Sequence, residues 1–309
     1  MLAAVGVGPA SEQARAAGVP ATTPVALSPV APGRPLHALT VDVEDWFQSC
    51  IDYDAPITER VIGNVERALA VFDDCEVKAT FFVQGRVAET FPALLQTILA
   101  EGHEVQAHGY SHRPLFGMDE SALREELERT RETVEAASGT RVTAFRAQDF
   151  SILEGNLWAL DMIADAGFTV DSSIFPLRTK RYGIHGWDVA PHLVTLSDGR
   201  RLLEVPVAVL GSGRRRLPVA GGGYFRLLPS AVLDRSIGAI GASGRPAVVY
   251  CHPYEFNPTE LDEYRGEVPS RVLRMQGLGR RSFVRRLRRL LRAHAFGRFD
   301  EVLAARGVT

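Results

Sequence analysis

The chain has 309 residues and a mass of 33.8 kDa, and 46% of its residues are hydrophobic. This is enough for one large domain or two small ones. The formal net charge of −2 excludes a general electrostatic attraction to nucleic acid or to anionic membranes. The three cysteines, Cys50, Cys75 and Cys251, are an odd number without metal-ligand spacing, which excludes a disulfide scaffold and favours a reducing compartment.

The first 35 residues differ in composition from the rest of the chain. They are mostly Ala, Gly, Pro, Val, Ser and Thr and contain no aromatic residue, so residues 1–35 are predicted to be a disordered lead. Their start lacks the basic segment of a signal peptide, and no run of about 18 apolar residues is long enough to span a bilayer. We expect a cytoplasmic protein.

From residue 36, short apolar strands alternate with amphipathic helices. The helices are predicted over residues 59–72, 89–100, 119–137 and 155–166, and residues 175–201 interrupt the pattern with a long insert. Such alternation indicates parallel strands joined by right-handed crossovers. Seven strands are predicted, at residues 37–41, 79–83, 104–107, 143–146, 168–171, 203–207 and 247–251.

The C-terminal part is basic. We divide the chain into the lead, a main domain over residues 36–265 and an Arg-rich helical extension over residues 266–309. In this extension, five arginines flank an apolar stripe of Val284, Leu287, Leu290 and Leu291; the arginines are Arg285, Arg286, Arg288, Arg289 and Arg292. We favour a surface helix packed on the main domain. The alternative is contact with an anionic lipid surface or a phosphate-bearing substrate.

A glycine-rich run at residues 221–226 has some likeness to a phosphate-binding loop. It lacks the lysine and the strand-to-helix setting that such a loop needs, so we do not assign it that role.

The predicted strands end in ionisable residues. His108 and His112, four residues apart, follow the third strand, and at that spacing two imidazoles can converge on one divalent cation. In a barrel of parallel strands, the carboxyl ends open on one face, where catalytic groups collect. Six further residues are predicted to lie at that face, namely Asp42, Glu44, Asp45, Arg146, Asp171 and His252.

These residue types are suited to metal-assisted hydrolysis. Two imidazoles and a carboxylate are a common zinc ligand set, and zinc acidifies a bound water and polarises a carbonyl. The carboxylate is either Glu44 or Asp45. Asp42 is the predicted base and His252 the predicted acid. Arg146 would hold Asp42 by a charge-assisted hydrogen bond, and Asp171 would orient His252.

The same residues in the same order resemble a known family. The acidic run after the first strand, His108-Gly109-Tyr110-Ser111-His112, Arg146, Asp171 and His252 are similar to the ordered motifs of nodulation-protein-type polysaccharide deacetylases, the family-four carbohydrate esterases. The resemblance runs from about residue 39 to residue 258. It implies a distorted seven-stranded (β/α) barrel and metal-dependent removal of acetyl groups from N-acetylated sugars.

Within that family, Asp42-Val43-Glu44-Asp45-Trp46-Phe47, residues 222–226 and His252-Pro253-Tyr254-Glu255 resemble the branch found with exopolysaccharide synthesis genes. Three departures stand out. The usual adjacent Asp-Asp pair is spread over residues 42–45, Gln148 replaces a proline, and Ile174 or Phe175 replaces a tryptophan.

The sequence thus predicts hydrolysis of an amide bond, with one divalent metal ion, zinc foremost, and an N-acetylated glycan or glycan precursor as substrate. Nucleic acid is not an expected partner. Two alternatives stay open: a metal-independent cyclic-amide or ureide hydrolase of related fold, and a non-catalytic glycan-binding module.

Overall fold

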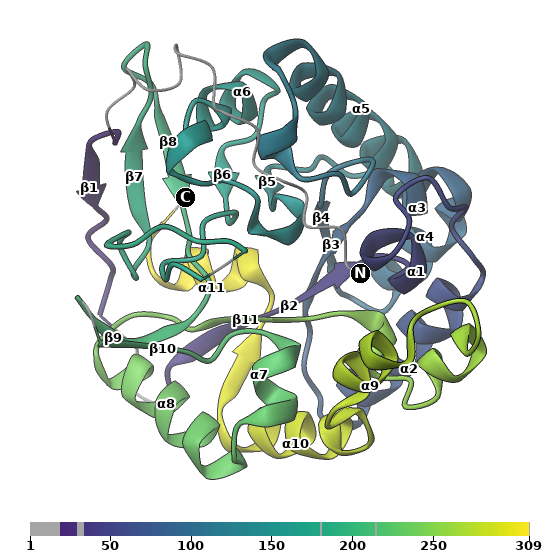
Figure 1. Cartoon of the computed structure of the whole chain (residues 1–309). Helices are drawn as coiled ribbons and strands as arrows, with labels where there is room; N and C mark the ends of the chain where they lie inside the picture. Colours follow the sequence, from purple (N-terminus) through teal and green to yellow (C-terminus); the bar gives the residue numbers. More distant parts are fainter. Residues whose placement is uncertain (1–18, 30–33, 180, 214, 309) are drawn as a thin grey trace.

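A mixed α/β fold is built around parallel strands, as predicted (Figure 1). The computed structural model describes residues 19–29, 34–179, 181–213 and 215–308. Seven strands run parallel in the order β8, β6, β5, β4, β3, β2, β11. Their bounds are β2 Leu36–Val43, β3 Thr80–Val83, β4 Glu104–Ala107, β5 Ala144–Phe145, β6 Val170–Asp171, β8 Arg201–Glu204 and β11 Val248–Cys251.

The ends of this sheet are joined through the segment that follows β8. The backbone N–H of Ala208 donates to the carbonyl of Val248 at 2.8 Å, and the N–H of Tyr250 donates to the carbonyl of Ala220 at 2.8 Å. Between these contacts lies a hairpin, β9 Val209–Ser212 and β10 Arg215–Pro218. The strands therefore curl into the distorted barrel that was predicted, and their carboxyl ends share one rim.

Helices pack around the sheet and bury one face each. The longest, α5, covers Glu120–Ser138 and buries Leu123, Leu127 and Val134. Asp119 caps its first turn by accepting from the N–H of Ala122, and Gly139 ends it with a φ of 68°. The other helices of the barrel are α1 Trp46–Cys50, α2 Arg60–Asp74, α3 Gly85–Thr90, α4 Pro92–Ala100, α6 Ala159–Asp165, α7 Gly222–Leu227 and α8 Ser230–Ala242.

One predicted helix, at residues 89–100, is two helices. It breaks at Phe91 between α3 and α4 because Pro92 has no N–H to donate and disfavours a helical residue before it. The remaining turns are short 3₁₀ helices, η2 Leu115–Gly117, η3 Gln148–Phe150, η4 Glu154–Asn156, η5 Pro253–Glu255 and η6 Glu260–Tyr264.

The prediction of a disordered lead is wrong for residues 22–24. These form β1, which pairs antiparallel with β7, His192–Thr195, inside the predicted insert, and β7 pairs antiparallel with β8. The ladder to β7 satisfies the backbone groups of Thr22–Pro24, and Thr22 Oγ1 donates to Asp188 at 3.0 Å. Residues 1–18 and 30–33 of the predicted lead lie outside the described residues.

The C-terminal segment is part of the barrel and not an extension from residue 266. It contains α9 Ser270–Gly277, α10 Arg280–Ala293, β12 Ala295–Gly297 and α11 Phe299–Ala305, and β12 pairs parallel with β2. The boundary was wrong because the three residues of β12 are too few for a visible strand pattern. In the predicted apolar stripe of α10, Leu287, Leu290 and Leu291 are buried and Val284 is half-buried. Among the described residues, no helix has the length and apolar character to cross a membrane.

Candidate active site

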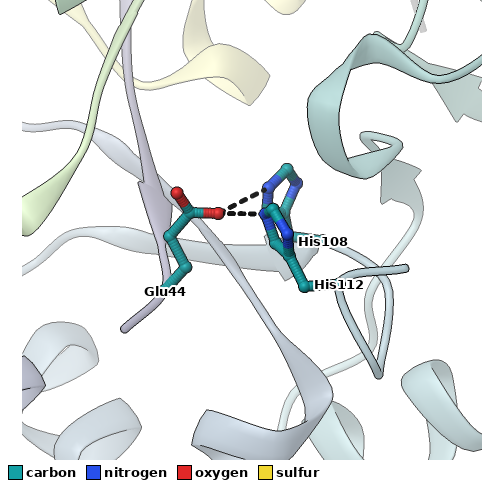
Figure 2. A group of neighbouring side chains, drawn as sticks. All are labelled: Glu44, His108 and His112. Atoms are coloured by element: carbon teal, nitrogen blue, oxygen red, sulfur yellow. Dashed lines mark ion pairs between the residues drawn. The ribbon is translucent and has the colours of Figure 1, made fainter. Parts of the chain in front are cut away.

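Glu44, His108 and His112 converge at the carboxyl ends of β2 and β4 (Figure 2). Each is at most 4% exposed, and their ligand atoms lie within 4.8 Å of one another. Glu44 Oε2 contacts His112 Nε2 directly and lies 3.7 Å from His108 Nε2. Two ring nitrogens and one carboxylate oxygen thus face one point.

These donors fit a single divalent cation. The Nδ1 atom of His108 lies 2.9 Å from the carbonyl oxygen of Arg146, which can only accept, so Nδ1 carries the proton. In a neutral ring, the Nε2 lone pair is then directed at Glu44, as in metal sites whose histidines are oriented by a second hydrogen bond. His108, His112 and Glu44 are a common zinc ligand set that leaves one coordination position open.

The charges of the group are strongly coupled. Burial alone would raise the pKa of Glu44, but His112 and His108 lower it well below its usual range. Burial alone would lower the pKa of His112, yet the Glu44 carboxylate raises it. The buried carboxylate therefore requires positive charge beside it, from a protonated imidazole or a cation.

Asp45, the alternative third ligand, points away from the two imidazoles and caps the N-terminus of α1. Its Oδ1 accepts from the N–H groups of Phe47 and Gln48 at 3.0 and 3.2 Å and so caps α1. Its Oδ2 accepts from the N–H of Thr58 at 3.0 Å and from the Thr58 hydroxyl. Because β2 ends at Val43, the next residue, Glu44, faces the imidazoles and Asp45 turns into the helix cap.

The turn that carries the two histidines is tightly built. Gly109 has a φ of 65° and His112 a φ of 66°, both in the left-handed region. A Cβ on Gly109 would lie 2.1 Å from Gln148 Oε1, so only glycine fits there. Gln148 Nε2 donates to the carbonyl of Arg113 at 2.6 Å. Gln148, which departs from the family pattern, therefore supports the histidine turn.

The predicted ion pair between Arg146 and Asp42 is present. Arg146 is fully buried and donates through Nη1 to Asp42 Oδ1 and to Thr40 Oγ1, both at 2.7 Å. Its Nη2 donates to Ser172 Oγ at 3.1 Å, and its guanidinium lies 4.2 Å from the centre of the Phe82 ring. These contacts fix the Asp42 carboxylate at the end of β2, beside the metal-ligand group.

His252 joins the group from the end of β11. Its Nε2 lies 3.7 Å from Glu44 Oε1, its Nδ1 lies 3.3 Å from Glu255 Oε2, and the ring of Tyr254 stacks on it at 4.9 Å. Burial alone would lower the pKa of His252, but Glu255 and Glu44 raise it to about 9. His252 is therefore protonated at neutral pH and can give up a proton.

The predicted partner of His252, Asp171, lies elsewhere. None of the contacts described for His252 involves Asp171, which accepts from the Ser173 hydroxyl at 2.5 Å and from the Ser173 N–H at 3.2 Å. Burial raises the pKa of Asp171 and, more strongly, that of Glu204 beside it. The Asp171 carboxylate beside Glu204 adds to this rise in the pKa of Glu204, so Asp171 is partnered by Ser173 and Glu204 and not by His252.

Glu255 is the site residue that the sequence reading missed. It follows His252 by three residues in a 3₁₀ turn, and its Oε2 also accepts from the His252 N–H at 3.1 Å. Arg226 Nε lies 3.1 Å from Glu255 Oε1. A Cβ on Gly222 would lie 1.6 Å from Glu255 Oε2, which explains the glycine-rich run: it brings α7 against this carboxylate.

A pocket of about 160 Å³ opens above the metal-ligand group. Besides that group, Asp42, His252 and Glu255, its wall contains aromatic side chains and an exposed ion pair at 2.6 Å between Arg181 and Asp149. Phe175, one of the two residues expected at the position of the family tryptophan, packs against the pocket aromatics Phe150 and Tyr182. Asp42, His252 and the Glu44–His108–His112 group thus line one pocket.

Two family models match the chain in succession. Residues 50–160 match the model described as polysaccharide deacetylase, and residues 172–304 match the model described as a domain of unknown function (DUF3473). Residues 50–160 of the chain are therefore similar to polysaccharide deacetylases. The deacetylase match holds His108, His112 and Arg146, whereas His252 and Glu255 come from the second match.

Several of the curated relatives that the chain matches are described as deacetylases. A peptidoglycan deacetylase of Helicobacter pylori is 30% identical over 173 residues, which cover 53% of this chain and 54% of that protein. A peptidoglycan-N-acetylglucosamine deacetylase of Bacillus cereus is 37% identical over 86 residues, which cover 28% and 31%. The chain therefore spans between about a third and half of the length of these two relatives.

A solved structure shares the fold of the chain. The crystal structure of a putative polysaccharide deacetylase from Mycobacterium smegmatis superposes with a TM-score of 0.54 at 23% identity, covering 87% of this chain and 96% of that one. The likeness supports the barrel architecture.

Proposed function

We propose that this chain removes acetyl groups from N-acetylated amino-sugar units of a glycan or glycan precursor, with one divalent metal ion, zinc foremost, held by Glu44, His108 and His112. The observation that carries the proposal is the meeting of Glu44, His108, His112, Asp42 and His252 in one pocket. A bound divalent cation would polarise the acetyl carbonyl and acidify the attacking water.

The protein's own residues supply the proton transfers. Arg146 engages Oδ1 of Asp42, which leaves Oδ2 to accept a proton from the attacking water. His252, whose protonated form the Glu255 carboxylate favours, would give its proton to the nitrogen of the departing amino sugar. The products are acetate and a free amine. Glu255 would keep His252 in the orientation from which this transfer occurs.

The two alternative functions have less support. The departure from the family pattern at Gln148 would favour a non-catalytic glycan-binding module if it disturbed the pocket, but Gln148 supports the histidine turn and the pocket residues stay together. A metal-independent hydrolase would not require two imidazoles and a carboxylate directed at one point. The relation to exopolysaccharide synthesis rests on the resemblance of short motifs and is part of the proposal.

The test is acetate release from N-acetylglucosamine oligomers by purified protein, before and after metal removal and zinc addition. We expect acetate and free amine in equal amounts, loss on chelation and return with zinc. His112→Ala should abolish release, and His185→Ala, a change at an exposed histidine, should leave it unchanged. Undiminished release by His112→Ala, or no release with any divalent ion, would contradict the proposal.

A further inference from the structure

One face of the protein combines positive charge with exposed apolar side chains. It is formed by the end of α7, by α9 and by α10, which lie together at the lower edge of Figure 1, and we call it the arginine face. Residues 270–293 contain nine arginines and no acidic residue, although the whole chain has a net charge of −2. The exposed members of the face are Arg271, Arg274, Arg281, Arg285, Arg289, Leu227, Met275 and Leu278.

The arginines of α10 fall into two groups. Some have structural contacts: Arg286 donates to the carbonyl of Leu228 at 2.6 Å, and Arg288 and Arg292 pair with Asp74 at 3.1 and 3.2 Å. Others, at a spacing of four, are Arg281, Arg285 and Arg289, for which no ion pair or hydrogen bond is found within the described residues. The fold does not use this second group.

Apolar side chains are also exposed on this face, at the end of α7, in α9 and just before α10. Leu227, Met275 and Leu278 are 63%, 61% and 51% exposed, and they are three of only five large apolar residues with such exposure in the described part of the chain. Two hydrogen bonds show that the three residues lie in one region. Arg226, next to Leu227 in the chain, donates through Nη1 to the carbonyl of Leu278 at 3.3 Å, and the N–H of Leu278 donates to the carbonyl of Met275 at 3.4 Å. A group of apolar side chains exposed to water is unfavourable, and such groups mark surfaces that bind a partner or a membrane.

The pairing of unused arginines with projecting apolar side chains is typical of a surface that rests on a membrane. Arginines attract the anionic headgroups of lipids, and apolar side chains insert between the headgroups and the acyl chains of the bilayer. A nucleic acid would use the charge but would give no reason for the exposed leucines and methionine.

The arginine face also borders the pocket. Gly223 and Arg226 of α7 and Gln276 of α9 line the pocket wall, so the same two elements carry the pocket and the apolar tips. We propose that the arginine face docks the protein on anionic lipid membranes, with the pocket mouth beside the lipid surface.

The experiment is sedimentation of the full chain with vesicles. We expect binding to an equal mixture of phosphatidylcholine and phosphatidylglycerol, no binding to phosphatidylcholine alone, and loss of binding as salt screens the charges. The triple change Arg281→Gln, Arg285→Gln and Arg289→Gln should weaken binding about 100-fold, because each arginine near an anionic surface contributes roughly fivefold. The pair Leu227→Ser and Met275→Ser should weaken it roughly tenfold.

The matched control removes the same charge elsewhere. Arg67→Gln, Arg141→Gln and Arg201→Gln change three exposed arginines outside the arginine face and should leave vesicle binding near that of the wild type. Equal weakening by both triple variants would overturn the proposal, and so would binding to DNA or heparin without binding to vesicles. Thermal melting of each variant identifies any that fails to fold. Vesicle binding is measured without turnover, so its outcome is independent of deacetylation.

Discussion

The Oε2 atom of Glu255 lies 3.3 Å from Nδ1 of His252 and 3.1 Å from the backbone N–H of the same residue. One carboxylate thus holds both the ring and the backbone of the proposed acid. His252 and Tyr254 stack, so the ring is fixed from its face as well as from its edge. This arrangement resembles the way in which a second carboxylate orients a metal-ligating histidine.

Glu255→Gln tests the importance of this carboxylate. The amide keeps the size of the side chain but removes the negative charge that holds the imidazolium, so we expect kcat to fall about 10- to 100-fold with KM and bound zinc little changed. Glu267→Gln, at an exposed glutamate, is the control. A loss of kcat in Asp171→Asn but not in Glu255→Gln would instead support the pairing predicted from the sequence.

Gly222→Ala tests the same contact from the other side. The added methyl group would meet the Glu255 carboxylate, and the carboxylate would have to leave His252. We expect kcat to fall as in Glu255→Gln while zinc content is kept. Gly223→Ala is a matched control in the same helix, because its Cβ would have only Arg226 Nη2 near it, at 3.9 Å. Equal activity of the two variants would argue against the close packing.

Zinc titration of variants of Glu44 and Asp45 distinguishes the proposed metal ligand from the residue that caps α1. We expect Glu44→Gln to weaken zinc binding strongly because it removes one of three ligands. Asp45→Asn should bind zinc as the wild type does but lose about 1 kcal/mol of stability or less, since asparagine also caps helices while the contact to Thr58 is weakened. Calorimetric titration with zinc and urea unfolding measure the two effects. The reverse result would move the third ligand to Asp45.

The buried pair of Glu204 and Asp171 predicts a pH-dependent stability. Folding raises the pKa of Glu204, so the folded state holds this proton more tightly than the unfolded chain. The stabilisation that this proton gives to the folded state is complete below about pH 4.3, the pKa of a glutamate in the unfolded chain. It is lost as the pH rises towards the pKa of Glu204 in the folded state. Relative to the wild type, Glu204→Gln should therefore gain several degrees in Tm at about pH 8 and less at about pH 5.

Thermal melts of both proteins across this pH range provide the measurement. His252 and other groups titrate in both proteins, so the difference between them isolates Glu204. A difference in Tm that does not depend on pH would mean that Glu204 ionises normally when buried.

The site residues at the strand ends could be predicted because each of them directly follows or ends a strand that is visible in the sequence. Six of the seven parallel strands end at or directly before an ionisable residue, and the shared rim of a parallel barrel brings these residues together. This reasoning placed Asp42, His108, His112, Arg146 and His252 in the neighbourhood where the structure has them.

The parts that could not be predicted depend on tertiary contacts. The choice between Glu44 and Asp45 is made by the residue at which β2 ends and by the partners of the α1 cap. Glu255 was hidden because a glutamate three residues after a histidine is common on any surface, and only the approach of Gly222 reveals its role. The strands β1 and β12 have three residues each and form only because a neighbouring strand is already in place.

The pairing of β12 with β2 determines where the chain can be truncated for recombinant expression. Residues 295–297 lie beside residues 36–38, while β3 begins its pairing with β2 at Thr40, so β12 covers the first part of the strand that leads to Asp42 and Glu44. A recombinant fragment that stops at residue 265 would expose this backbone edge and the apolar surface beneath α10, and such edges promote aggregation. Expression trials should therefore retain the C-terminal helices even when only residues 36–265 are of interest.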